Sequence, residues 1–121
     1  MKIKKLDINF TVCKIKDLTG VNFTRNFVFT AKTDEEISLV CETSYTPANA
    51  TAKEDGFLAF RIEGILDFSL IGVISKITAI LAGDKIGVFV VSTYNTDYVF
   101  VKSRDFERSV LLLENEGYIC E

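Results

Sequence analysis

The stretch GFLAFRIEGILDFSLIGVISKITAILAGDKIGVFVVSTYNTDYVFVK, residues 56–102, decides the fold because its apolar spacing changes period twice. Residues 57–65 are apolar on both parities, which is typical of a strand that is covered on both faces. From 70 to 81 the apolar residues recur at the spacing of one helical face. The run 85–92 is again rich in β-branched residues, and after a short turn another strand is predicted over 97–102.

A polar turn, LDFSLIG at 66–72, separates the first of these strands from the helix. Ser69 is predicted to cap the helix, and Gly83 to end it in a left-handed conformation. A second helix is predicted from Ser103 to Gly117, followed by a very short last strand. The order β, α, β, β, α, β is that of the split βαβ or ferredoxin-like module, which belongs to the α+β class.

The half of the chain that precedes this module is predicted to be rich in strands. Alternating apolar residues over 6–15 indicate one strand, and the runs 27–32 and 36–43 indicate a hairpin. Residues 44–55, SYTPANATAKED, contain the only Pro of the chain together with small and polar residues. We therefore interpret them as a linker between two modules.

Charge and residue usage exclude several classes of function. The formal charge of −3 comes from 17 acidic and 14 basic residues that are intermingled, so no basic face is expected and nucleic acid is not a predicted partner. The chain has no His, which rules out His-based catalytic triads and the commonest zinc sites. Cys13, Cys41 and Cys120 are far apart and are interpreted as reduced, mostly buried thiols. We expect neither a metal nor a cofactor.

No stretch of the sequence predicts a membrane segment or a secretion signal. The longest apolar run, 70–82, is interrupted by Lys76 and is too short to span a bilayer. The basic start of the chain lacks the apolar core of a signal peptide. A cytoplasmic location without membrane contact is the expectation.

The strand at 85–92 is expected at an edge of the sheet, because the strand after the first helix lies there in this topology. It carries few charges to discourage pairing with another strand. We therefore predict that it is covered, either by the first half of the chain or by a second copy of the protein.

With this order of elements, the segments LDFSLIG, ISKITAILA and VSTYNTDYVFVK within Glu63–Tyr118 resemble the ACT domain. More closely, the sequence resembles the short bacterial ACT proteins that are related to the cellular arginine sensors and to the regulatory domains of aspartate kinase. Such proteins carry a diverged first half, and FVFTAKTDEEISLVCE resembles it. The resemblance implies an ACT domain at 56–121 and a diverged, β-rich, ACT-like half at 1–55 that includes the linker 44–55.

The resemblance also implies a regulatory module and no enzyme. ACT domains pair side by side, here as an expected homodimer, and bind amino acids or other small metabolites at the junction of two modules. They use the turn between the first strand and the first helix. The ligand-binding positions that follow are Leu66, Asp67, Phe68, Ser69, Leu70, Ile71 and Gly72.

The residue types at this turn suit a free amino acid. Unpaired N–H groups at the start of the helix favour the ligand carboxylate, and Asp67 or Asp97 can take the ammonium. The alternative is that Asp67 and Ser69 only cap the helix, Gly72 is a packing glycine and Asp97 belongs to a turn. At the level of the whole protein, the alternative is an ACT-type assembly or dimerisation module without a ligand.

Overall fold

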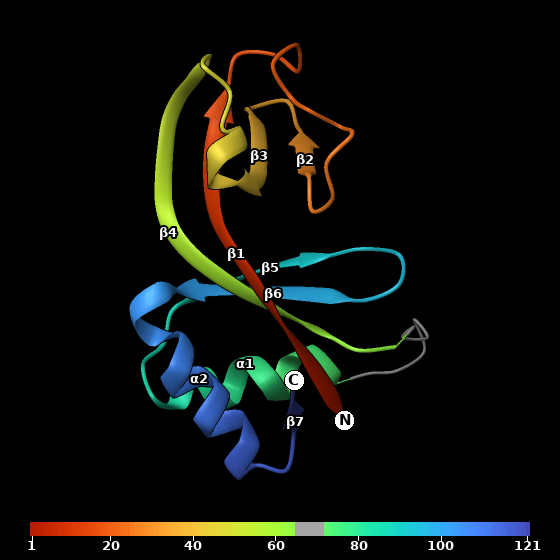
Figure 1. The fold of residues 1–121 in the computed structure, drawn as a ribbon, viewed down its shortest axis with the longest axis vertical. Helices are drawn as coiled ribbons and strands as arrows, with labels where there is room; N and C mark the ends of the chain where they lie inside the picture. The colour runs from red at the N-terminus through yellow and green to blue at the C-terminus, as the bar shows by residue number, and fades with distance from the viewer. Residues whose placement is uncertain (65–71) are drawn as a thin grey trace. The chain divides into compact units, whose positions relative to one another are not determined.

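The structure is a computed structural model that describes residues 1–64 and 72–121 of the chain (Figure 1). Two compact units divide the chain. The first unit comprises Met1–Asp7 and Leu58–Glu121, and the second unit comprises Ile8–Phe57. The turn residues from Leu66 to Ile71 lie outside the described residues.

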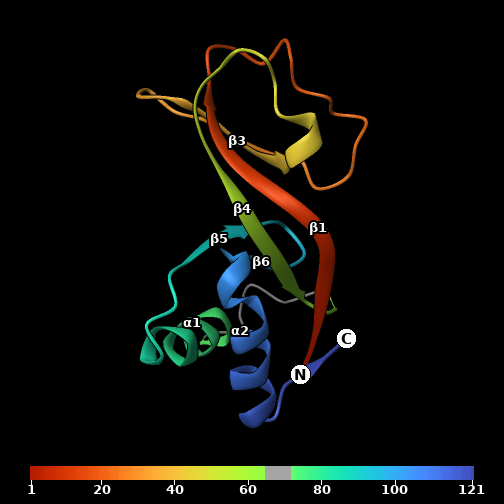
Figure 2. The ribbon, with the colours of Figure 1, turned by 60° about the vertical axis from the view of Figure 1, so that its left-hand side comes forward.

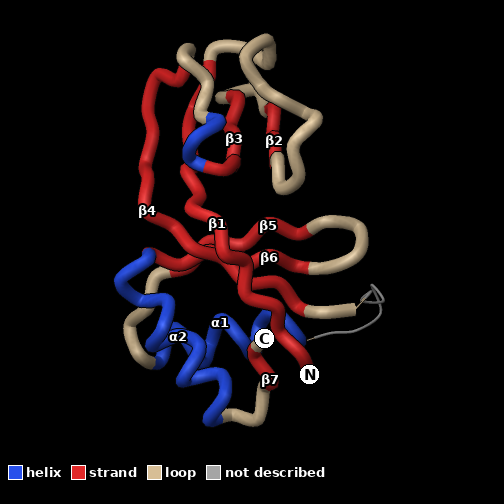
Figure 3. The backbone as a smooth tube through the Cα atoms, in the orientation of Figure 1, coloured by secondary structure: helices blue, strands red, loops and turns tan. Residues whose placement is uncertain are grey.

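The first unit confirms the predicted ferredoxin-like order of strands and helices (Figure 3). Its elements are the end of β4 (Ala50–Ile62), α1 (Val73–Gly83), β5 (Val88–Ser92), β6 (Asp97–Lys102), α2 (Ser103–Asn115) and β7 (Ile119–Cys120). In the sheet β6 lies between β4 and β5, so β5 is at an edge among the described strands. This is the edge position that the sequence predicts for the run 85–92.

The start of β1 (Lys2–Ile15) also belongs to the sheet of the first unit. β7 runs parallel to it and pairs Ile119 with Lys2. On the other side of β1, the backbone N–H of Glu63 donates to the carbonyl of Lys2 at 2.9 Å. The first residues of the chain therefore separate β7 from β4, and Figures 1 and 2 show the two chain ends together at this edge.

One hydrophobic core holds the helices of the first unit against its strands. Figure 2 shows α1 and α2 side by side. The buried residues of this core are Ile3, Phe60, Ile62, Ile77, Leu81, Ile86, Val99, Val101 and Leu113. Because Ile and Val are weak helix formers, this packing rather than intrinsic propensity stabilises α1.

Both ends of α1 differ from the prediction. The helix begins at Val73 with Gly72 in the N-cap position, so the prediction that Ser69 caps it is wrong. Gly72 has φ 83°, which glycine adopts at little cost. At the other end Lys85, rather than Gly83, has the left-handed backbone conformation. The chain turns at Lys85 because its N–H donates to the carbonyl of Ala82 at 3.0 Å, beyond the end of the helix at Gly83.

The second unit contains the predicted hairpin. Its strands are the end of β1, β2 (Phe29–Lys32), β3 (Ile37–Glu42) and the start of β4, in the sheet order β2, β3, β1, β4, with a 3₁₀ turn η1 (Thr43–Tyr45) after β3. The hairpin turn closes where the N–H of Thr33 donates to the carbonyl of Glu36 at 2.9 Å. A small core of Cys13, Ile15, Leu39 and Cys41 fills this unit.

Residues 44–55 are not a linker throughout, which corrects the sequence-based interpretation. The 3₁₀ turn η1 ends at Tyr45, and β4 already begins at Ala50. Residues 51–56 of this strand are exposed, so they carry no apolar pattern that could reveal a strand. Pairing with β1 forms the strand here, because context outweighs the weak strand preference of Ala, Lys and Asp.

The three cysteines are free, and Cys13 and Cys41 are buried while Cys120 is half-buried. Burial raises the pKa of the Cys41 thiol to about 11, and the neighbouring Cys13 adds to the rise. Burial likewise raises the pKa of Cys13 and of Cys120. The thiols therefore remain protonated at neutral pH, where a protonated thiol is a poor nucleophile.

Candidate ligand-binding site

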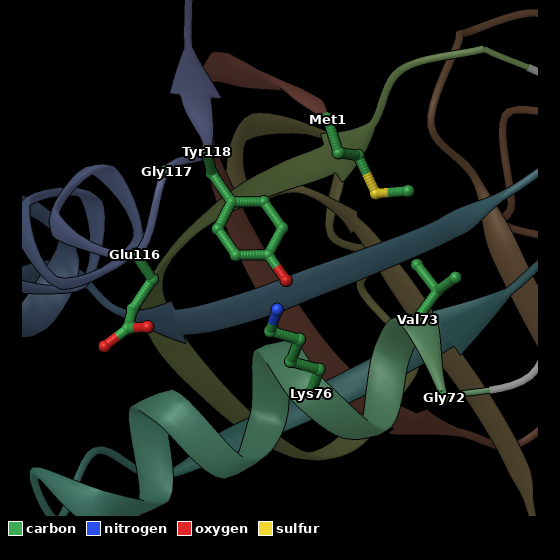
Figure 4. Close-up of a pocket in the computed structure, with 7 residues that line it drawn as sticks. All are labelled: Met1, Gly72, Val73, Lys76, Glu116, Gly117 and Tyr118. Carbon is green, nitrogen blue, oxygen red and sulfur yellow. The ribbon is translucent and has the colours of Figure 1, made fainter.

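A pocket of 340 Å³ opens in the first unit where α1 begins and α2 ends (Figure 4). Its lining residues are Met1, Gly72, Val73, Lys76, Glu116, Gly117 and Tyr118. The volume lies at the lower end of the range of about 300–1,000 Å³ that is typical of small-molecule pockets. The pocket therefore has room for a small metabolite.

One wall of the pocket is the first turn of α1. The carbonyl of Gly72 accepts a hydrogen bond from the N–H of Lys76 at 2.9 Å, which starts the helical pattern. Lys76 thus lies one turn beyond Gly72, and helical side chains project back toward the N-terminus. In Figure 4 the Lys76 ammonium points toward the opposite wall of the pocket, and Val73 adds an apolar surface at the start of the helix.

The opposite wall is the segment that leads from α2 to β7. Gly117 has φ 93°, and the N–H of Tyr118 donates back to the carbonyl of Leu113 at 3.1 Å, so the chain turns sharply at the end of α2. In Figure 4 the Tyr118 hydroxyl and the Lys76 ammonium point toward one another from the two walls. Met1 is held beside them because its carbonyl accepts the N–H of Ile119 at 3.1 Å.

Charged groups of both signs are found among the described lining residues. Among the described lining residues, Lys76 has a cationic side chain and Glu116 an anionic one, and both are exposed, while Met1 carries the N-terminal ammonium. Within residues 1–64 and 72–121 neither Lys76 nor Glu116 has an ion-pair partner. No described residue therefore occupies either charge.

The predicted site residues are only partly described. Leu66, Asp67, Phe68, Ser69, Leu70 and Ile71 lie outside the described residues. Gly72 lines the pocket. Asp97 is not in the lining; it is the first residue of β6, where it accepts a hydrogen bond from the Ser92 hydroxyl.

A polar residue that the sequence analysis missed fixes the strand end that precedes the turn. Thr96 is only 8% exposed, and its hydroxyl donates to the carbonyl of Ile62 at 2.7 Å. This bond ties the β5–β6 hairpin to the end of β4, two residues before residue 64, the last described residue ahead of the predicted turn. Thr96 falls in the short turn predicted before the strand 97–102, and nothing local in the sequence indicates its distant partner.

The second unit contains a larger pocket whose carboxylates already have ion-pair partners. It has a volume of 450 Å³ and is lined by Asn9, Glu42, Thr43, Ser44, Asp55 and Gly56. Arg25 lies 3.4 Å from the Glu42 carboxylate, and Lys53 lies 3.7 Å from the Asp55 carboxylate. The buried hydroxyl of Thr11 also donates to Asp55, at 2.7 Å. With its carboxylates partnered, this pocket offers less to a charged ligand than the pocket at α1.

We expect Gly72→Ala to lower the free energy of unfolding by about 1–2 kcal/mol, because an L-residue is strained at positive φ. Among the described residues, no heavy atom lies within 4 Å of where the new Cβ would sit, so a clash with them does not contribute. Chemical denaturation followed by circular dichroism measures the change.

Gly83→Ala is the matched control for this prediction. Gly83 stands at the other end of α1 with equally open space around its Cβ position and no positive φ. It should leave stability unchanged or raise it by up to about 1 kcal/mol, because Ala is the better helix former. Equal effects of the two substitutions would contradict the assigned backbone of Gly72.

Two features that the described residues lack bear on function. In the described part of the chain, no group of three or more His, Cys, Asp or Glu residues is placed to hold a metal ion. None of the helices described is both long and apolar enough to cross a membrane.

Comparison with known proteins finds one matching family and several similar structures. Residues 52–115 match the family model described as the ACT domain. A crystal structure of an Agobacterium tumefaciens protein is similar at 28% identity, covers 99% of this chain and 91% of its own, and has a TM-score of 0.86. No curated protein matches the sequence.

Two structures of aspartate kinase regions are similar in fold. The kinase of Clostridium acetobutylicum is 19% identical, with 93% of this chain and 33% of that chain covered and a TM-score of 0.63. A putative C-terminal regulatory domain of aspartate kinase from Porphyromonas gingivalis is 16% identical, with 93% and 92% covered and a TM-score of 0.55.

Proposed function

Because the chain belongs to the ACT domain family, whose members are regulatory domains that bind small molecules, we propose that it senses an amino acid. The observation that carries the proposal is the pocket at the start of α1, which Gly72 lines and whose described residues present charged groups of both signs. A free amino acid has the complementary pair of charges. A regulatory role requires no catalytic residue, and we propose that the protein is not an enzyme and acts in the cytoplasm.

The proposed ligand site lies at the interface between two modules, with the pocket on one side of it. The turn residues 66–72 and Asp97 are its proposed contacts. Along the chain, the modules are the ACT domain at 56–121 and the diverged ACT-like half at 1–55.

The proposed homodimer forms along β5. β5 pairs with β6 on one side, and on its other side no strand is paired among the described residues. Residues 88–91 of this strand are apolar and half-buried. An apolar edge of this kind favours pairing with a strand of a second copy.

A thermal-shift screen with the twenty common amino acids tests the proposal. We expect at least one to raise the melting temperature, because a ligand at 100 times its Kd adds about 2.7 kcal/mol to the free energy of unfolding. Sedimentation analysis of the same sample should show a dimer. No shift with any amino acid, using folded protein, would reject amino acid sensing.

The second candidate function is an ACT-type assembly module that pairs through β5 and binds no ligand. The apolar edge strand favours it, because pairing alone explains that feature. Asp67→Ala and Asp97→Ala distinguish the two functions. The sensing function expects lost amino acid binding in a folded protein, whereas the assembly function expects changes in stability alone.

A further inference from the structure

We infer that two copies of β5 pair antiparallel in one register, with Val90 of one copy opposite Val90 of the second copy. The inference rests on the homodimer proposed along β5. It adds to that proposal the residue at the two-fold axis and the backbone groups that make the contact. The register follows from the hydrogen-bond pattern of β5, the length of the strand and the symmetry of a dimer.

The pairing of β5 with β6 determines which backbone groups of β5 point away from β6. The hairpin turn closes where the N–H of Thr93 donates to the carbonyl of Thr96 at 2.8 Å, so these two residues form a hydrogen-bonded pair. In an antiparallel ladder, hydrogen-bonded pairs alternate with non-hydrogen-bonded pairs. In the register of β5 and β6, Phe89 and Val91 therefore point their N–H and carbonyl groups toward β6.

The other residues of the strand direct their backbone N–H and carbonyl groups away from β6. These outward residues are Val88, Val90 and Ser92. Among the described strands β5 pairs with β6 alone, so the outward groups are the ones that a strand of a second copy would use. Each hydrogen-bonded pair across the dimer must therefore join two outward residues.

Symmetry and strand length then select the register. In a two-fold dimer both copies use the same surface, so two edge strands that pair around the axis run antiparallel. With Val90 opposite Val90, Val88 lies opposite Ser92, and every outward residue of the five-residue strand has an outward partner. A slip by two residues leaves one outward residue of each copy without a partner, and a slip by one residue places outward groups opposite inward ones. The register centred on Val90 therefore forms the most hydrogen bonds.

The side chains on the two faces of β5 suit the same register. Val88 and Val90 pack against the core that holds α1 and α2, so Phe89 and Val91 lie on the other face of the sheet. Phe89 stacks on Phe100 of β6, with ring centroids 4.6 Å apart and ring planes at 4°. In the inferred register Phe89 of each copy lies opposite Val91 of the other. Pairs of an aromatic and a β-branched residue stabilise antiparallel sheets.

Hydrogen exchange of the dimer, measured by NMR on the full chain, tests which backbone groups are bonded. The N–H groups of Val88, Val90 and Ser92 should exchange at least about tenfold more slowly than unprotected peptide groups, although β6 leaves them without a partner. The N–H groups of Phe89 and Val91 are the internal controls, because their bonds to β6 should protect them in any case. Fast exchange at the outward residues beside slow exchange at these controls would contradict the inference.

Cysteine crosslinking tests the register. Val90→Cys should give a disulfide-linked dimer under mild oxidation with copper phenanthroline, because the Cα atoms of a directly opposite bonded pair are about 5.5 Å apart, within the reach of a disulfide. Val88→Cys is the matched control, on the same face of the same strand. It should crosslink at least about tenfold more slowly, because the two copies of residue 88 then lie four residues out of line. The native chain, with its own three cysteines, gives the background.

The outcomes separate this inference from the proposed function. A dimer with fast exchange at the outward N–H groups, or with crosslinking of Val88→Cys at least as fast as that of Val90→Cys, would overturn the register and leave dimerisation as such standing. A monomer in sedimentation would overturn the homodimer together with the inference. Neither result bears on amino acid sensing, which the thermal-shift screen tests separately.

Discussion

Ile77→Ala should lower the free energy of unfolding by about 2–5 kcal/mol, the range for removing a large aliphatic side chain from a packed core. Ile77 is 0% exposed and packs in the core of the first unit together with Leu81 of the same helix. Because α1 has few strong helix formers, little else compensates for the loss of this contact. Urea denaturation measures the change, and Ile77→Val should cost only about 0.5–1.5 kcal/mol.

Lys76→Met is the control on the same helical turn. Lys76 is exposed, so its replacement should change the free energy of unfolding by no more than about 0.5 kcal/mol. The two substitutions therefore separate two roles of α1, since Ile77 anchors the helix in the core and Lys76 faces the pocket. If Ile77→Ala proved as mild as Lys76→Met, the packing of α1 against the sheet would be wrong.

The order of strands and helices in the first unit could be predicted because each element leaves its own period in the sequence. The apolar residues of α1 recur on one face, and the β5–β6 hairpin shows as two β-branched runs around a turn. Burial of one face produces this periodic pattern, so a helix or strand could be predicted wherever one of its faces is buried.

The parts that could not be predicted depend on pairing between distant segments. The exposed start of β4 has no apolar alternation and forms a strand through β1. Lys2 joins the sheet of the first unit through Ile119 and Glu63, which lie far away in the sequence. Backbone pairing uses groups that every residue carries, so it leaves little trace in the choice of side chains.

The same distinction applies to the candidate site. Gly72 was predicted as a ligand position from the resemblance to the ACT domain, and Lys76 could have been added because it stands one helical turn later. Glu116 and Tyr118 reach the pocket only through the turn after α2, about forty residues further along the chain. No local spacing relates them to Gly72, so only the fold brings the charged side chains of the pocket together.

Thr96→Val should lower the free energy of unfolding by about 1–3 kcal/mol, the cost of leaving a buried acceptor without its donor. The substitution keeps the shape of the side chain but removes the hydroxyl that donates to the carbonyl of Ile62. Ile62 is itself fully buried, which limits the access of water as a replacement. Chemical denaturation measures the loss.

Thr96→Ser separates the hydrogen bond from the rest of the hairpin. It retains the hydroxyl and loses one methyl group, so it should cost about 1 kcal/mol or less. The turn itself should persist in both variants, because the N–H of Thr93 still donates to the backbone carbonyl of residue 96, as it does at 2.8 Å in the native chain. A larger loss from Thr96→Ser than from Thr96→Val would mean that side-chain packing, and not the bond to Ile62, holds the hairpin to β4.

Since β4 leads directly into the proposed ligand turn, Thr96→Val should also weaken amino acid binding, whereas Thr96→Ser should preserve it.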